Sequence, residues 1–411
     1  MRLRTIFIFL LLVSITFFSG VFPNQFVDSS SVSLTYFPTD EWRTASPEDV
    51  GINPSKLDSM YQTIIDQNMG IDSIHIVRHG YLVYEQYFDY YNYTTLHQMW
   101  STTKSIASIV VGIANASGFI SNLDEPILDI FSERTFANVD AKKQAITIRH
   151  LLQMQSGLLW NEQDVPYLSG TVSKHDYELL SNLSEANWAN WSFNPDSDTV
   201  QMVNSSDWIQ FVLDKPMFTP PGTFFYYNSG VSHLLSAIIQ KKTGMNTAHF
   251  ANQFLFGPLG ISDYLWVNDS LGISTGGFGL CLRPFDMVKI GYLFLNNGMW
   301  NGSQIVPPQW VQESTQDYDM GYGYQWWIHD APYFYHSAGF GGQFIIIKSD
   351  DDLVVAITAS EYHTGNPWSL IDNFIFASIL SDPPPPQSIN FASLMIFISV
   401  GTIVFFRKKS D

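Results

Sequence analysis

The sequence predicts an α+β fold: an antiparallel β-sheet formed by N- and C-terminal strands, flanked by helices, with a mostly helical insertion. Two observations predict it. Hairpin patterns occur near residues 73–88 and again near 343–358, and the segments between them are patterned as helices and loops. The chain has 411 residues, of which 45% are hydrophobic, so it is long enough to bury a large core.

The first elements of the predicted domain are a helix and a hairpin. A helix is expected over 54–67, with Pro54 near its start. Residues 73–78 and 81–88 alternate in the manner of two strands, and the dipeptide at 79–80 contains the glycine that a tight turn favours. The pattern therefore predicts a β-hairpin.

The middle of the chain is expected to be helix and loop. Helices are predicted over 151–155, 231–242 and 284–296. The last of these has Pro284 in its first turn and Gly298 just after its end, which is the usual asymmetry of helix ends. This region supplies the helical insertion.

A second hairpin is predicted near the C-terminus. Residues 343–348 and 353–358 are apolar runs, and they flank the acidic turn 349–352. Because strands precede and follow the helical region, we expect both ends of the domain to share one sheet.

The N-terminal residues carry a targeting pattern. Residues 1–20 are predicted to be a signal sequence or an uncleaved anchor, because Arg2 and Arg4 precede an apolar run over 6–13. Residues 21–38 are expected to be a linker.

The C-terminal residues predict a membrane segment. Residues 382–388 are a stiff proline-rich linker, and 389–406 contain 16 consecutive residues without a charge. The basic tail 407–411 fits the cytoplasmic side of a membrane. We therefore expect a domain over 39–381 on the extracytoplasmic side; an amphipathic or core helix is the alternative for the apolar run.

Composition excludes several classes of function. The formal net charge of −18 repels nucleic acid. The single cysteine, Cys281, lies in an apolar stretch and is expected to be an inert buried thiol. His75 and His79 are four residues apart on and after a strand, where that spacing does not converge on a metal. We expect no cofactor and no catalytic metal.

The sequence contains a Ser-x-x-Lys pattern at Ser101 and Lys104. Residues at i and i+3 share one helix face, so the lysine amine can approach the serine hydroxyl. An apolar helix follows, which would stabilise negative charge near the hydroxyl and favour a neutral amine. The same pattern also occurs at ordinary helix starts, so further elements are needed.

Two further elements supply candidate site residues. Tyr226 and Asn228 stand between a proline-glycine turn and a predicted helix, which would present a phenol and an amide. His336 begins a glycine-rich strand entry in which the N–H of Gly339 could join the N–H of Ser101 as an oxyanion hole. By itself this third element would be read as a β-bulge.

The order and spacing of these elements resemble the serine β-lactamase and penicillin-binding-protein superfamily, and in particular its 6-aminohexanoate-oligomer hydrolase and esterase branch. Framework segments at 148–157, 220–229, 276–287 and 323–327 extend the resemblance over 48–381. The resemblance implies that this chain is a serine hydrolase.

It also implies a role for each candidate residue. Ser101 would be the acylated nucleophile, Lys104 its base and Tyr226 the proton relay to the leaving group. Asn228 would bind the substrate carbonyl. His336 stands where many members have the lysine of Lys-Thr-Gly, so a fixed cation for a β-lactam carboxylate is missing, which disfavours a β-lactamase.

The expected substrate is a small-molecule or peptide-like acyl compound, cleaved at an ester or amide bond. The alternatives are a D-amino-acid peptidase or β-lactamase-type activity, and a catalytically silent binding module on the same fold. Residues 160–208 are expected to form a long loop over the site, with an acyl pocket or simple aromatic packing at Trp160, Tyr167, Trp188 and Trp191. The oligomeric state is left open.

Overall fold

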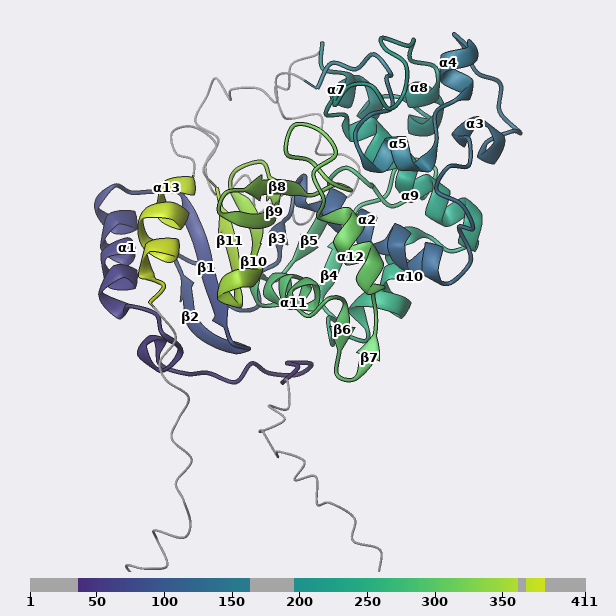
Figure 1. Ribbon diagram of the computed structural model, residues 1–411. Helices are drawn as coiled ribbons and strands as arrows, with labels where there is room; N and C mark the ends of the chain where they lie inside the picture. Colours follow the sequence, from purple (N-terminus) through teal and green to yellow (C-terminus); the bar gives the residue numbers. More distant parts are fainter. Residues whose placement is uncertain (1–35, 163–195, 361–366, 381–411) are drawn as a thin grey trace, which may run out of the picture. The chain divides into compact units, whose positions relative to one another are not determined.

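A six-stranded antiparallel sheet organises the part of the chain that the computed structural model describes, residues 36–162, 196–360 and 367–380 (Figure 1). The strand order is β2-β1-β11-β10-β9-β8, so the N-terminal hairpin pairs with the C-terminal strands. The predicted α+β fold is confirmed. The strands of this sheet are β1 (Ile71–Arg78), β2 (Tyr81–Tyr87), β8 (Trp327–Asp330), β9 (Tyr333–Gly339), β10 (Gln343–Lys348) and β11 (Leu353–Ala359).

Both predicted hairpins form. The turn between β1 and β2 consists of His79 and Gly80, with φ of +52° and +72°. Two successive positive φ angles match the right-handed twist of the flanking strands. Asp352, in the turn between β10 and β11, also has a positive φ of +49°, and its carbonyl accepts a hydrogen bond from His79 N at 3.1 Å. The two turns therefore lie together at one end of the sheet.

Helices cover both faces of the sheet. Along β10, Ile346 packs with the hydrophobic side chains of α1, whereas Ile345 and Ile347 pack in the larger core that contains α2 and α11. Alternation along a strand sends successive side chains to opposite faces, and here both faces are buried. The covering helices are α1 (Pro54–Asp66) with α13 (Trp368–Leu370) on one face, and α2 (Thr102–Ala116) with α11 (Pro284–Leu295) on the other.

The helical insertion lies between the two sets of strands, as expected (Figure 1). Its long helix α9 packs against α2, α5 and α8. Its helices are α3 (Ile127–Ile130), α4 (Ala141–Gln144), α5 (Ile148–Leu152), α7 (Asp198–Val203), α8 (Trp208–Leu213), α9 (Ser229–Thr243) and α10 (Thr247–Ala251).

Smaller elements connect the insertion to the main sheet. A three-stranded sheet of order β3-β5-β4 lies beside the start of α2, and a two-stranded ribbon and α12 follow α11. These elements are β3 (His97–Gln98), β4 (Tyr264–Trp266), β5 (Leu280–Leu282), β6 (Met299–Trp300), β7 (Ser303–Gln304) and α12 (Pro308–Ser314).

Two predicted boundaries differ from the structure. The helix predicted over 151–155 is α5, which ends at Leu152 because Met154 has a φ of +56° and leaves the helical region. The loop predicted over 160–208 contains α7 at Asp198–Val203. The rest of that predicted loop lies mainly at 163–195, outside the described residues.

The predicted signal sequence or anchor at 1–20, the proline-rich linker, the membrane segment at 389–406 and the basic tail all lie outside the described residues. Within the described ranges, none of the helices combines the length and the apolar character that crossing a membrane requires.

Candidate active site

Ser101 sits at the N-terminus of the buried helix α2, immediately after a strained residue. Trp100 has a φ of +47°, in the left-handed region that bulky side chains rarely adopt. The preceding Met99 donates its N–H to Leu280 O of β5 at 2.8 Å. A backbone conformation of this kind persists when the surrounding structure enforces it, and such positions cluster at functional sites. The left-handed conformation of Trp100 turns the chain sharply from β3 into α2 and places Ser101 at the turn.

Lys104 is buried, with 1% of its side chain exposed, and points at Ser101. Its Nζ donates hydrogen bonds to Ser101 Oγ at 2.9 Å, to Ser229 Oγ at 2.9 Å and to Gly277 O at 2.7 Å. Burial lowers the pKa of Lys104 from 10.5 to about 8, although the charge of Glu162 opposes the shift. The amine is therefore available in its neutral form near neutral pH.

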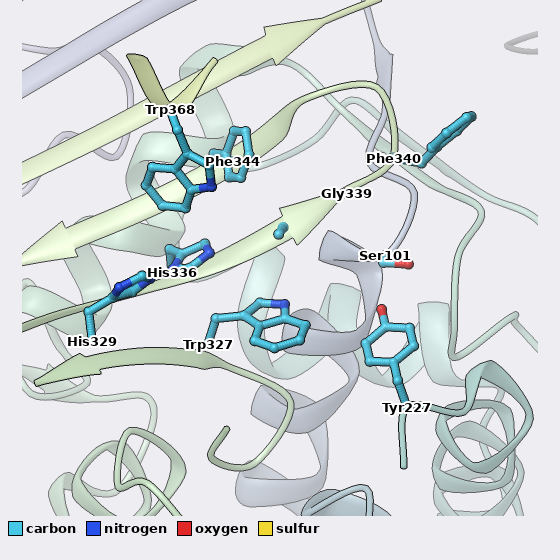
Figure 2. A pocket seen from close by; sticks show the side chains of 10 residues that line it. Ser101, Tyr227, Trp327, His329, His336, Gly339, Phe340, Phe344 and Trp368 are labelled. Atoms are coloured by element: carbon cyan, nitrogen blue, oxygen red, sulfur yellow. The ribbon is translucent and has the colours of Figure 1, made fainter. Parts of the chain in front are cut away.

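The tyrosine beside Ser101 is Tyr227, not the predicted Tyr226. The Tyr227 hydroxyl lies close enough to the Ser101 side chain to interact with it, and the Lys104 amine lies 4.8 Å from the centre of the Tyr227 ring. Figure 2 shows the Tyr227 hydroxyl directed at Ser101. Burial raises the pKa of Tyr227 well above its usual value, so its hydroxyl keeps its proton at neutral pH.

Backbone geometry explains why the side chains of Tyr226 and Tyr227 point in different directions. The chain is extended just before α9, with Asn228 at φ −152° and ψ 107°, and successive side chains of an extended chain point to opposite sides. Tyr227 and Ser229 therefore face Lys104. Tyr226 packs its ring against Phe218 and Phe224 instead.

Asn228 caps a helix. Its side-chain oxygen accepts a hydrogen bond from Val231 N at 3.0 Å at the start of α9, and 1% of the residue is exposed. The structure therefore gives its side-chain oxygen a capping contact. Its Nδ2 is buried without a hydrogen-bond partner among the described residues, so the contact with a substrate carbonyl stays a prediction. The Tyr-x-Asn pattern at 226–228 overlaps a Tyr-x-Ser pattern at 227–229, and only the second reaches Lys104.

Glu162 and Ser229 were not predicted as site residues, yet they join the same network. Ser229 Oγ donates to Glu162 Oε1 at 2.5 Å, and Ser229 N donates to Oε2 of the same carboxylate at 2.8 Å. Trp160 Nε1 also donates to this carboxylate, at 2.5 Å. A chain of polar contacts thus runs from Glu162 through Ser229 to Lys104. No local pattern marks Glu162, which is 67 residues from Ser229 in sequence.

Trp160 is the described member of the four predicted pocket aromatics. It is 1% exposed and packs edge-to-face against Phe211, with ring centres 6.1 Å apart. This is aromatic packing, the alternative expected from the sequence. Tyr167, Trp188 and Trp191 lie outside the described residues.

A pocket of about 500 Å³ opens beside Ser101, and His336 and Gly339 of β9 line it (Figure 2). Gly339 allows a close backbone approach, since a Cβ there would lie 2.2 Å from Met99 O. The β9 strand can therefore lie directly against the residues that precede Ser101. Ser101, Tyr227, His336 and Gly339 share this pocket.

Two other candidate chemistries receive no support from the described residues. Cys281 is buried, and burial raises the pKa of its thiol to about 12, in agreement with the predicted inert thiol. His79 contacts Asp352 at 2.8 Å, and His75 contacts the Tyr87 hydroxyl at 3.0 Å. Within the described ranges, no group of three or more His, Cys, Asp or Glu residues is arranged to hold a metal ion.

Comparisons with known proteins agree with this fold. Solved structures with the same fold include a putative 6-aminohexanoate-dimer hydrolase from Bacillus anthracis, with a TM-score of 0.62 and 22% identity over 84% of this chain and 88% of that one. A putative beta-lactamase from Bacteroides dorei gives a TM-score of 0.61 with 17% identity, covering 80% of this chain and 99% of that one. A family VIII carboxylesterase gives 0.60 with 15% identity, covering 81% and 98%.

Sequence comparison identifies the family directly. No curated protein matches the chain in sequence. The family model described as Beta-lactamase, however, matches residues 58–275, which is more than half of the chain and includes Ser101, Lys104 and Tyr227. This protein is therefore a serine hydrolase that belongs to the beta-lactamase family.

Proposed function

We propose that the protein cleaves an ester or amide bond through an acyl-enzyme formed on Ser101. The observation that carries the proposal is the buried Lys104 amine, 2.9 Å from Ser101 Oγ, with its pKa lowered to about 8. A neutral amine at that distance can take the hydroxyl proton while the oxygen attacks a carbonyl carbon.

The other residues would complete the cycle. The N–H groups of Ser101 and Gly339 would hold the oxyanion of the tetrahedral intermediate. Tyr227, which keeps its proton, would pass a proton to the leaving group as the carbonyl re-forms. Lys104 would then return to Tyr227 the proton that it took from Ser101. Water would attack the ester on Ser101 and give a proton to the neutral Lys104, which would pass it to Ser101 Oγ as the carboxylic acid product leaves.

The substrate is proposed to be a small-molecule or peptide-like acyl compound, with carboxylesterase or amidase activity ahead of D-peptidase activity. Support comes from His336, which replaces a cation with a neutral imidazole, because burial and the neighbouring His329 lower the pKa of His336 to about 3. Solved structures of the same fold include a putative 6-aminohexanoate-dimer hydrolase and a family VIII carboxylesterase.

We further propose that this domain is held on the extracytoplasmic side of a membrane by the segment 389–406. The support is the uncharged stretch and the basic residues after it. The full chain should stay with the membrane pellet after an alkaline carbonate wash, and a chain ended at Ser388 should be released in part or wholly. A full chain extracted by carbonate would contradict the proposal.

Labelling of the full chain with a fluorophosphonate tests the nucleophile. Intact mass should show one adduct on the wild type and none on Ser101→Ala, whereas Ser105→Ala, a neighbouring serine on the same helix, should still be labelled. An unlabelled wild type with an intact thermal transition would favour the silent binding module instead. Turnover of short p-nitrophenyl esters and of D-Ala-D-Ala peptides then separates the two activities, and a peptide-only profile would contradict the esterase assignment.

A further inference from the structure

The pocket beside Ser101 is lined largely by ring-bearing residues. Trp327, His329, Phe344 and Trp368 line it together with His336 (Figure 2). These rings pack against one another: His336 and Trp368 have ring centres 4.8 Å apart, and Phe344 and Trp368 are 5.2 Å apart. Packed rings hold their positions without a ligand, so the pocket is preformed for a flat apolar group.

None of the described residues that line this pocket has a side chain charged at neutral pH. His336 is 4% exposed, and its pKa is lowered to about 3 by burial and by His329. The pKa of His329 is itself lowered by burial. A carboxylate bound here would lose its hydration without gaining a cation in return, which is costly. The chain also carries a net charge of −18, which repels anions at a distance.

His336 also has an unused polar atom. Its Nδ1 is buried and lacks a hydrogen-bond partner in the described residues. A buried polar atom without a partner costs free energy, and a polar atom of a ligand or a water carried with it can recover that cost. The pocket thus combines ring-bearing walls with neutral polar groups, among them the imidazole of His336.

The pocket starts at Tyr227, which stacks on Trp327 with an interplanar angle of 15° and ring centres 6.0 Å apart. Under the proposed function, Tyr227 gives its proton to the leaving group. The group that occupies the pocket beyond Tyr227 is therefore the leaving group rather than the acyl group.

We propose that this pocket selects uncharged esters or amides whose leaving group is aromatic or similarly flat and apolar, and that His336 excludes leaving groups bearing a carboxylate. The inference rests on the proposed hydrolysis at Ser101. It predicts discrimination between substrates that differ only in charge at the far end of the leaving group.

The test compares methyl 4-acetoxybenzoate with 4-acetoxybenzoate, which share an acetyl group and an aryl leaving group but differ by one negative charge. We expect kcat/KM of the full-length wild type for release of acetate to be at least about tenfold higher with methyl 4-acetoxybenzoate than with 4-acetoxybenzoate. His336→Lys supplies the missing cation and should reduce that preference by about tenfold or reverse it. Ile65→Lys adds the same charge on the exposed side of α1 and should leave the ratio unchanged.

The outcomes separate the two proposals. Equal kcat/KM for the two esters in the wild type, or a preference for the acid, would overturn the pocket inference while leaving the acyl-enzyme intact. No turnover of either ester, together with no fluorophosphonate adduct, would overturn the proposed function itself. Because the wild-type ratio needs no variant, the inference remains testable if His336→Lys does not fold.

Discussion

At the scale of single residues, the site depends on a lysine that folding makes usable as a base. A free lysine is almost wholly protonated at pH 7, whereas a pKa of about 8 leaves roughly a tenth of Lys104 neutral. Glu162 acts in the opposite direction, because its negative charge favours the protonated amine. Glu162 and Tyr227 are the titratable groups that the structure places around this amine, and Tyr227 stays protonated.

Removing the charge of Glu162 should therefore shift the pH dependence of activity. In Glu162→Gln, the acidic limb of the kcat/KM profile should move to lower pH, because the pKa of Lys104 falls further without the carboxylate. Glu162→Asp keeps the charge and should keep the wild-type midpoint. An unchanged midpoint in Glu162→Gln, measured between pH 5 and 10 with a neutral ester, would show that the carboxylate acts only through packing.

The two adjacent tyrosines provide a matched pair. Tyr227→Phe should lower kcat by about 10²-fold or more, because the proposed proton donor to the leaving group is lost. Tyr226→Phe should keep wild-type turnover, since that ring lies against Phe218 and Phe224. Steady-state kinetics on both variants settle the assignment, and the reverse pattern would restore the residue predicted from sequence.

At the scale of elements, two helix starts and one strand bring the site together. The N-terminus of α2 presents Ser101, the N-terminus of α9 presents Ser229, and β9 brings Gly339 against Met99. Asn228 caps α9 and stands in sequence between Tyr227 and Ser229, the two residues that contact the site. Local helix formation thus fixes the directions of both neighbours.

Loss of this cap should affect stability and activity together. Asn228→Ala should cost about 1 kcal/mol of unfolding free energy and also reduce kcat/KM, because Tyr227 and Ser229 lose their anchor. Asn53 caps α1 through Ser55 N at 3.0 Å, at a distance from the site, so Asn53→Ala should cost a similar free energy without loss of activity. Urea denaturation and ester turnover on both variants test this. Equal kcat/KM values for Asn228→Ala and Asn53→Ala would show that the cap on α9 does not contribute to catalysis.

At the scale of the whole molecule, the buried amine should couple stability to pH. The folded state holds the pKa of Lys104 near 8, whereas the unfolded chain has the ordinary value of 10.5. Between these values the unfolded state binds the extra proton, so the contribution of Lys104 to the unfolding free energy rises with pH and is lowest below pH 8.

A comparison with Lys104→Met isolates this contribution. The unfolding free energy of the wild type minus that of Lys104→Met should increase as pH rises from 8 towards 10.5, because titrations of other groups cancel in the difference. Urea denaturation at several pH values measures it. A difference that stays constant over this range would mean that the amine is not desolvated as the structure indicates.

The sequence by itself determined what depends on residues close together in the chain. The hairpin turn at 79–80, the proline start of α11 and the pairing of Ser101 with Lys104 across one helical turn all follow from local geometry. Hairpin patterns at both ends of the domain also predicted one antiparallel sheet, because strands precede and follow the helical region.

Only the tertiary structure decided which polar groups meet. Tyr226 and Tyr227 are equivalent as local patterns, and the direction in which the extended chain enters α9 selects Tyr227. Glu162 reaches Ser229, and Ser229 reaches Lys104 across 125 residues of sequence. Such contacts depend on how helices pack on the sheet. The low pKa of Lys104 and the neutral His336 have the same origin, because burial is a property of the assembled core.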